Sequence, residues 1–188
     1  MKITTIIIIF FSLQLAGQSS DTLELKKSFD KLQQTDNEAN QRNYFNLFPD
    51  NFNSFEQTFG YFDEKPTPLY DDSYDYIIKF YSLDKISKSD KFEKFINISI
   101  GGKWDADAVN YFQHELRLRI LLDLDLTYNI LKNKTDKEIE SFFYFFFHEI
   151  HSQYETIPTE FDKIMDMDKE FYKLIIIGHK RAINDSGH

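Results

Sequence analysis

A run of six consecutive aromatic residues, Phe142–Phe147, is the feature that most constrains how this chain can fold. The segment Thr135–Glu138 before it has the Thr-x-x-Glu pattern of a capping box, which is typical of a helix start. A helix over both segments carries rings on almost every side and leaves little polar surface to face water. The pattern therefore predicts a central, aromatic-rich helix that runs through the middle of the domain.

Apolar residues at steps of three and four predict helices in most of the remaining chain. Ile96, Ile98 and Ile100 alternate with polar residues and also suit a strand, but the sequence offers no partner strand, so we favour a helix. Pro66 and Pro68 favour an extended connector before the next helix. Helices are expected over residues 22–35, 54–60, 71–83, 89–99, 105–131 and 135–147, and from residue 159 onward. The predicted fold class is all-α, a compact single-domain bundle of about six or seven helices.

The composition is consistent with a core built from aromatic rings. The chain has 188 residues, of which 20 are Phe, 11 are Tyr and one is Trp, and it has no cysteine. Each buried ring removes roughly 150–250 Å² of surface from water, so packing alone can hold such a domain together. Without cysteine, disulfides, thiol nucleophiles and thiolate metal sites are excluded.

The first residues have the pattern of a bacterial secretory signal peptide. Lys2 precedes an apolar stretch that begins at Ile3, and Ala16 and Gly17 supply small residues before Gln18. The apolar stretch is shorter than the roughly 20 residues that a membrane-spanning helix needs. A bacterial lipoprotein would carry a cysteine at position 18. We therefore expect a signal peptide over residues 1–18, a single helical domain over residues 19–188, and a periplasmic protein without lipid or stable membrane anchor.

The charge balance narrows the class of partner. The chain carries 22 basic and 31 acidic residues, for a net charge of −9. The negative electrostatic potential of such a chain opposes binding to nucleic acid and to anionic lipid. It favours a basic partner, although solubility alone also explains an acidic surface.

One histidine cluster resembles a metal site. His148, Glu149 and His151 lie close together in the sequence. On a helix, His148, His151 and Glu155 would share one face and be able to ligate zinc. The zinc-protease pattern, however, needs its two His four residues apart, whereas these are three apart. His114 is isolated in the sequence. We expect no metal, no cofactor and no catalytic site, and we keep a metal-dependent envelope hydrolase as an alternative.

The most unusual polar stretch is GGKWDADAVNYFQ, which starts at Gly101. It places the only Trp beside two acids at the expected start of a helix. Aromatic side chains dominate the energy of many protein interfaces, so this stretch predicts a protein contact. The alternative is that the Trp packs the incoming loop onto the core. The predicted partner-binding residues are Trp104, Asp105, Asp107, Asn110 and Tyr111.

The order of several motifs resembles a family of small exported helical proteins of Bacteroidetes-type bacteria. The residues that carry the resemblance are Phe48-Pro49, Phe52 to Phe55, Phe59-Gly60-Tyr61, Leu69-Tyr70, Trp104 to Tyr111 and the aromatic run to Phe147. Some members look like immunity proteins that neutralise antibacterial toxins delivered between cells. The family pattern has Asp-Gly-Pro-His-Pro after the aromatic helix, where this chain has His148 to Ser152, so no role at that corner is carried over.

The resemblance and the exported, acidic, cysteine-free chain together predict a non-catalytic binding protein of the periplasm. The specific expectation is an immunity-like inhibitor whose protein partner is a cognate toxin. A structural module, or one whose aromatic bundle encloses a pocket for an apolar ligand, is a further alternative.

Overall fold

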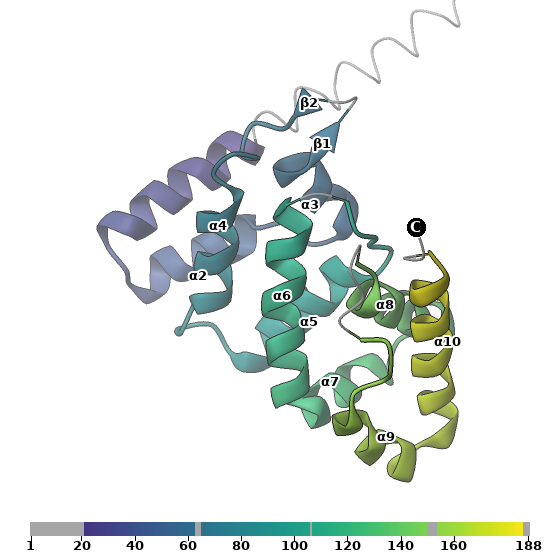
Figure 1. Cartoon of the computed structure of the whole chain (residues 1–188). Helices are drawn as coiled ribbons and strands as arrows, with labels where there is room; N and C mark the ends of the chain where they lie inside the picture. Colours follow the sequence, from purple (N-terminus) through teal and green to yellow (C-terminus); the bar gives the residue numbers. More distant parts are fainter. Residues whose placement is uncertain (1–20, 63–64, 106, 150–153, 186–188) are drawn as a thin grey trace, which may run out of the picture. The chain divides into compact units, whose positions relative to one another are not determined.

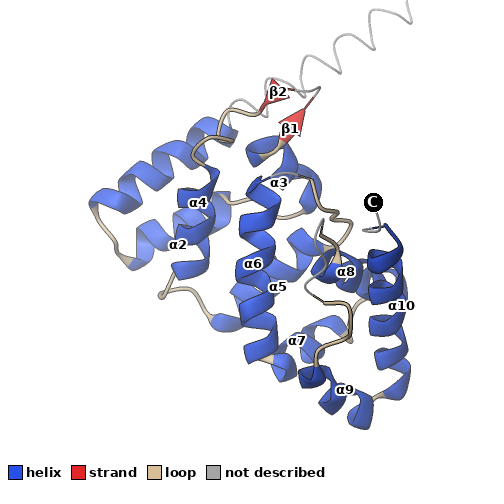
Figure 2. Cartoon of the chain, in the orientation of Figure 1, coloured by secondary structure: helices blue, strands red, loops and turns tan. Residues whose placement is uncertain are grey.

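The computed structural model describes residues 21–62, 65–105, 107–149 and 154–185 (Figure 1). Regular structure in these ranges is almost entirely α-helical, so the predicted all-α class is confirmed (Figure 2). The predicted number of six or seven helices is wrong, because the described residues form nine helices, α2 to α10, besides the helical residues 21–34. The predicted signal peptide, residues 1–18, lies outside the described ranges.

Two very short strands interrupt the series of helices. β1 and β2 pair antiparallel, with Tyr61 opposite Pro66, in the stretch expected to be an extended connector. After the helical residues 21–34, the elements are α2 (Glu38–Leu47), α3 (Phe52–Phe59), β1 (Tyr61–Phe62), β2 (Lys65–Pro66), α4 (Ser73–Ser82), α5 (Lys88–Ser99), α6 (Asp107–Leu122), α7 (Leu124–Leu131), α8 (Asp136–Phe147), η1 (Thr159–Phe161), α9 (Asp162–Met167) and α10 (Lys169–Asp185).

The chain divides into two compact units, which we describe separately. Among the described residues, one unit comprises residues 21–48 with Leu83–Ile86, and the other comprises the described parts of residues 49–82 and 87–185. The single domain expected over residues 19–188 stays a prediction.

In the first unit, α2 packs on the helix before it and holds a short segment from farther along the chain. The rings of Phe29 and Tyr44 lie 5.9 Å apart between their centroids. The Gln41 amide donates a 2.7 Å hydrogen bond to Asp84, and its oxygen accepts the Lys85 backbone N–H at 2.8 Å. Gln41, which is itself buried, therefore fixes the segment that contains Asp84 against α2.

In the second unit, α8 forms the centre of the aromatic core. Thr135 and Glu138 make the predicted capping box at its start, with the Thr135 N–H donating to the Glu138 carboxylate at 2.8 Å. All six aromatic residues of Phe142–Phe147 are buried, which confirms the expected burial of this run. A helix that is apolar on every side is stable only where other elements surround it.

Helix α10 covers one side of α8 at close range. The Phe171 ring lies 6.0 Å from Phe143, and the His179 ring lies 4.8 Å from Phe147. Gly178 permits this approach, because a Cβ atom at that position would lie 2.7 Å from the Cβ atom of Phe143. The last helix of the described chain is therefore part of the core.

Two aspartates divide segments that were expected to be single helices. Asp123 accepts the Leu126 N–H at 3.3 Å and caps α7, so the helix predicted over residues 105–131 becomes α6 and α7. Asp168 accepts the Phe171 N–H at 3.0 Å at the start of α10, and the last predicted helix becomes η1, α9 and α10. Both corrections have one cause: the carboxylate bonds a backbone N–H and starts a new helix, while the apolar spacing continues. Ile96 and Ile98 lie in α5, as expected.

Candidate functional site

The predicted partner-binding residues lie around the start of α6. Asp107 and Asn110 are exposed, whereas Trp104, Asp105 and Tyr111 are half-buried. The structure brings these residues together with three tyrosines and a pocket from other segments of the second unit, as the following contacts show.

Trp104 is anchored through its backbone. Its N–H donates a 2.9 Å hydrogen bond to Nδ1 of His148, the residue that follows α8. This bond fixes the loop that leads into α6 against the end of the aromatic helix. The anchoring agrees with a structural role for the loop, and it also holds the neighbouring acids in place.

Asp107 joins a pair of tyrosines. The Tyr70 hydroxyl donates to Asp107 Oδ2 at 3.3 Å, and the Tyr61 ring stands edge-on to the Tyr70 ring at 4.6 Å between centroids. Burial first, and then the negative charge of Asp107, raises the pKa of Tyr70 to about 12. The Tyr70 hydroxyl is thus a hydrogen-bond donor to Asp107.

A second pair of tyrosines links α4 to α6. The Tyr74 and Tyr111 rings meet edge-to-face, with their centroids 5.1 Å apart. Tyr74 is 53% exposed and Tyr61 is 42% exposed, so both pairs present ring surface to solvent. We call this set, which comprises Tyr61, Tyr70, Tyr74, Asp107, Asn110 and Tyr111, the tyrosine–acid surface.

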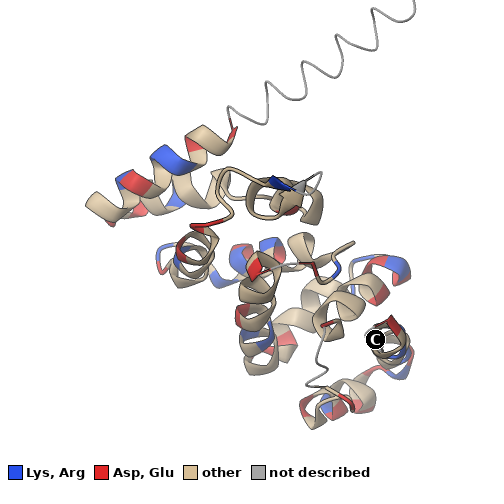
Figure 3. Ribbon diagram, turned by 45° about the horizontal axis from the view of Figure 1, so that its top comes forward, with Lys and Arg blue, Asp and Glu red and all other residues tan. Residues whose placement is uncertain are grey.

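The segments that form this surface are rich in acids. Figure 3 shows basic and acidic residues on most helices of the chain. A cluster of acids alone is therefore confined to particular segments. Exposed Asp71, Asp72 and Asp75 flank Tyr74 in the sequence, and Asp107 lies in the first turn of α6. A surface of this composition attracts a basic partner and repels an acidic one.

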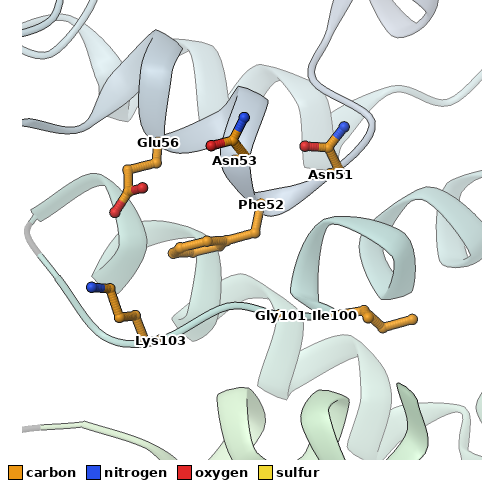
Figure 4. Close-up of a pocket in the computed structure, with 7 residues that line it drawn as sticks. All are labelled: Asn51, Phe52, Asn53, Glu56, Ile100, Gly101 and Lys103. Carbon is orange, nitrogen blue, oxygen red and sulfur yellow. The ribbon is translucent and has the colours of Figure 1, made fainter. Parts of the chain in front are cut away.

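Asp105 faces a different neighbour, Glu56 of α3. Burial and then the nearby negative charge of Asp105 raise the pKa of Glu56, and the Lys103 ammonium lowers it by a smaller amount. Glu56 lines a pocket of about 370 Å³ between α3 and the loop that follows α5 (Figure 4). The pocket is lined by Asn51, Phe52, Asn53, Glu56, Ile100, Gly101 and Lys103.

Sequence reasoning missed the three tyrosines that complete the surface. Tyr74 lies in the first turn of α4 and is exposed. Its spacing from Ile77 suits a core face, but the ring packs on Tyr111 at the surface instead. The signal that indicates the surface is the alternation of tyrosine and acid from Tyr70 to Tyr76.

The residues of the alternative metal site have other contacts. His148 Nδ1 accepts the bond from Trp104, and its ring stacks on Tyr144 at 4.7 Å. Glu149 is bound to Arg117, and His114 is exposed on α6. His151 lies outside the described ranges. Within those ranges, no group of three or more His, Cys, Asp or Glu is placed to hold a metal ion.

Two buried side chains of α6 hold the carboxyl end of α8. Gln113 Nε2 donates to the carbonyl oxygens of Phe145 and His148 at 2.7 and 2.9 Å, and Arg117 Nε donates to that of Phe146 at 2.7 Å. These carbonyls belong to the last turn of a helix and lack partners within it. The position of His148, and through it that of Trp104, is therefore set from within the core.

Comparison of the chain with protein-family models, curated proteins and solved structures finds no match. In the part of the chain that the structure describes, none of the helices combines the length and the apolar character needed to cross a membrane.

Proposed function

We propose that this chain is a non-catalytic binding protein of the periplasm, and specifically an immunity-like inhibitor that binds and neutralises a secreted antibacterial toxin. The observation that carries the proposal is the tyrosine–acid surface. The predicted signal peptide supports a periplasmic location, and the resemblance to exported immunity proteins supports a toxin as the partner.

Tyrosines suit an interface because each ring offers a large contact area at a small entropic cost and a hydroxyl that bonds water in the free protein. Here the rings of each pair already contact one another, at 4.6 Å for Tyr61 and Tyr70 and at 5.1 Å for Tyr74 and Tyr111. Such rings lose little freedom when a partner covers them. This arrangement supports a preorganised protein-binding surface.

The acids around the rings specify the chemistry of the partner. Asp107 and the exposed acids near Tyr74 favour a basic face on the toxin, because complementary charge speeds encounter and rejects acidic proteins. An acidic inhibitor would cover such a surface directly.

A protection assay tests the function. The chain is expressed with its leader in a sensitive host, together with a toxin encoded beside it in its own genome and directed to the periplasm. Survival with the chain and death without it support the proposal. Death in both cases, together with no binding between the two purified proteins, would overturn it.

Variants of the surface test the site. We expect Tyr74→Ala to weaken toxin binding by about tenfold or more, as central aromatic residues of interfaces do, and Asp107→Lys to slow association most at low salt. Leu122→Ala and Asp166→Lys are matched controls, because both residues are exposed on other parts of the second unit. An interface role would be contradicted if the control variants lost as much toxin affinity as the surface variants. It would also be contradicted if the loss of affinity tracked a fall in the melting temperature of each variant.

A further inference from the structure

The pocket beside Asp105 has walls that are fixed before any ligand arrives. On one wall, Asn51 caps α3 by accepting the Ser54 N–H at 2.9 Å. On the other, the Gly101 N–H donates to Ser141 Oγ at 2.8 Å, and Gly101 adopts a positive φ of 80° that favours glycine. A pocket whose walls are held in this way loses little entropy on binding.

Its interior combines an aromatic ring with polar groups. Phe52 is only 7% exposed and is held edge-on against Phe145 at 5.7 Å between centroids. Figure 4 shows Glu56 and Asn53 on the α3 wall and Lys103 on the facing loop, with the Phe52 ring beside them. The volume of about 370 Å³ lies at the lower end of the range of pockets that bind small groups.

The charge of the pocket favours a cation. Within the described ranges, Glu56 forms no ion pair, and the charge that acts on it most strongly is the repelling carboxylate of Asp105. Lys103 is exposed, and its attraction for Glu56 is weaker than the repulsion from Asp105. A positive group placed beside Glu56 would offset this repulsion.

We propose that this pocket receives an arginine side chain of the protein partner. The apolar stem would lie along the Phe52 ring, and the planar guanidinium would donate to the Glu56 carboxylate and to the Asn53 carboxamide oxygen. Arginine suits the pocket better than lysine because its flat fork of N–H donors bonds a carboxylate and a second acceptor together. The pocket and the tyrosine–acid surface are connected through the sequence, since α3 leads into Tyr61 and Lys103 lies four residues before Asp107.

This inference rests on the proposed function, but it is tested with a probe that needs no toxin. The probe is the blocked tripeptide Gly-Arg-Gly, and its uncharged control carries citrulline in place of arginine. Binding is followed by NMR through the side-chain amide signals of Asn51 and Asn53. The arginine peptide should shift these signals in the folded full-length mature chain, and the citrulline peptide should not.

Two variants of opposite sign make the test decisive. Glu56→Gln should weaken binding of the arginine peptide about tenfold, as expected for loss of a charged hydrogen bond. Lys103→Gln should strengthen the same binding, because it removes a competing positive charge. Glu93→Gln, an exposed acid on α5, is the matched control and should change nothing. The proposal would be overturned if Lys103→Gln bound the arginine peptide more weakly than wild type. It would also be overturned if the citrulline peptide shifted the Asn51 and Asn53 signals as much as the arginine peptide.

The two proposals fail in distinguishable ways. In one outcome, the chain binds the toxin, Tyr74→Ala weakens that binding, and Glu56→Gln changes binding of neither the toxin nor the peptide. The arginine pocket is then refuted and the immunity-like function stands. If the peptide binds as expected but the chain neither binds the toxin nor protects against it, the pocket stands and the function is refuted.

Discussion

The Arg117 guanidinium donates a 2.7 Å hydrogen bond to the Glu149 carboxylate, and the two residues are only 5% and 6% exposed. This pair joins the middle of α6 to the segment just after the aromatic helix. Arg117 also lies over the Tyr154 ring, with its guanidinium carbon 5.6 Å from the ring centroid. One nitrogen of the guanidinium, Nη2, has no hydrogen-bond partner among the described residues.

Removing one member of this pair should strongly destabilise the chain. We expect Arg117→Met to lower the free energy of unfolding by about 3–5 kcal/mol, because the buried Glu149 carboxylate would lose its 2.7 Å bond to the Arg117 guanidinium. Urea denaturation measures the change. The exposed pair Lys163–Asp125, at 2.6 Å, provides the control, and Lys163→Met should cost less than about 1 kcal/mol.

A double variant tests the cause of that loss. Arg117→Met combined with Glu149→Gln should recover part of the stability, because the buried charge that faced Arg117 is then removed as well. If the double variant is less stable than Arg117→Met alone, the loss comes from packing and not from the buried charge.

Adding a methyl group at Gly178 should separate α10 from α8. Alanine normally favours a helix by up to about 1 kcal/mol over glycine. At this position its Cβ atom would meet Phe143 at 2.7 Å, so we expect a net loss of about 1–3 kcal/mol. Ile177→Ala, at the adjacent exposed position, is the control in the same denaturation experiment and should have a small effect. A Gly178→Ala chain as stable as the original would mean that the helices move apart without cost.

The stability of the chain should fall as the pH drops below about 6.5. Burial, as the main cause, lowers the pKa of His148 from its usual value of 6.5. Between the lowered pKa and 6.5, the unfolded chain binds a proton at this residue and the folded chain does not, so acidification favours unfolding. Protonation would also remove the Nδ1 lone pair that accepts the Trp104 N–H.

Urea denaturation above and below pH 6.5 measures this effect. His148→Asn should flatten the pH dependence in that window, because asparagine does not titrate and its oxygen can still accept the N–H. His114→Asn, on the exposed face of α6, is the control and should leave the dependence unchanged. The same slope in the wild-type chain and His148→Asn would assign the effect to other groups.

The break between α6 and α7 should depend on the acceptor at Asp123. We expect Asp123→Ala to cost about 0.5–2 kcal/mol, the usual effect of losing an N-cap. Asp123→Asn keeps the acceptor for the Leu126 N–H but loses the ion pair with Lys88. The free energy of unfolding of Asp123→Asn should therefore lie between those of wild type and Asp123→Ala in denaturation experiments. Equal stability of the two variants would show that the ion pair, rather than the cap, supplies the stabilisation.

Local patterns predicted the helical class and the buried aromatic run because both depend on neighbours within a few residues. Phe142–Phe147 must be buried wherever its helix lies, and Thr135 with Glu138 specifies its start. The breaks at Asp123 and Asp168 were missed because a capping aspartate looks like any polar residue within an apolar stripe.

The candidate site depends on contacts between distant segments, which spacing does not reveal. Tyr70 meets Asp107 across 37 residues, and Tyr74 packs on Tyr111 across a similar separation. The sequence indicated the α6 side of the surface through its only Trp and two nearby acids. The tyrosines on the other side could not be predicted, because their place depends on the packing of α4 and the segment before it against α6.

The cover that α10 gives to α8 also sets when the aromatic core can be completed during synthesis of the chain. Phe143 and Phe147 lie against residues of α10, which is made after α8, so the aromatic helix has no complete shelter until the last helix has emerged. A nascent chain halted before α10 would expose the apolar surface of α8 and would be prone to aggregate.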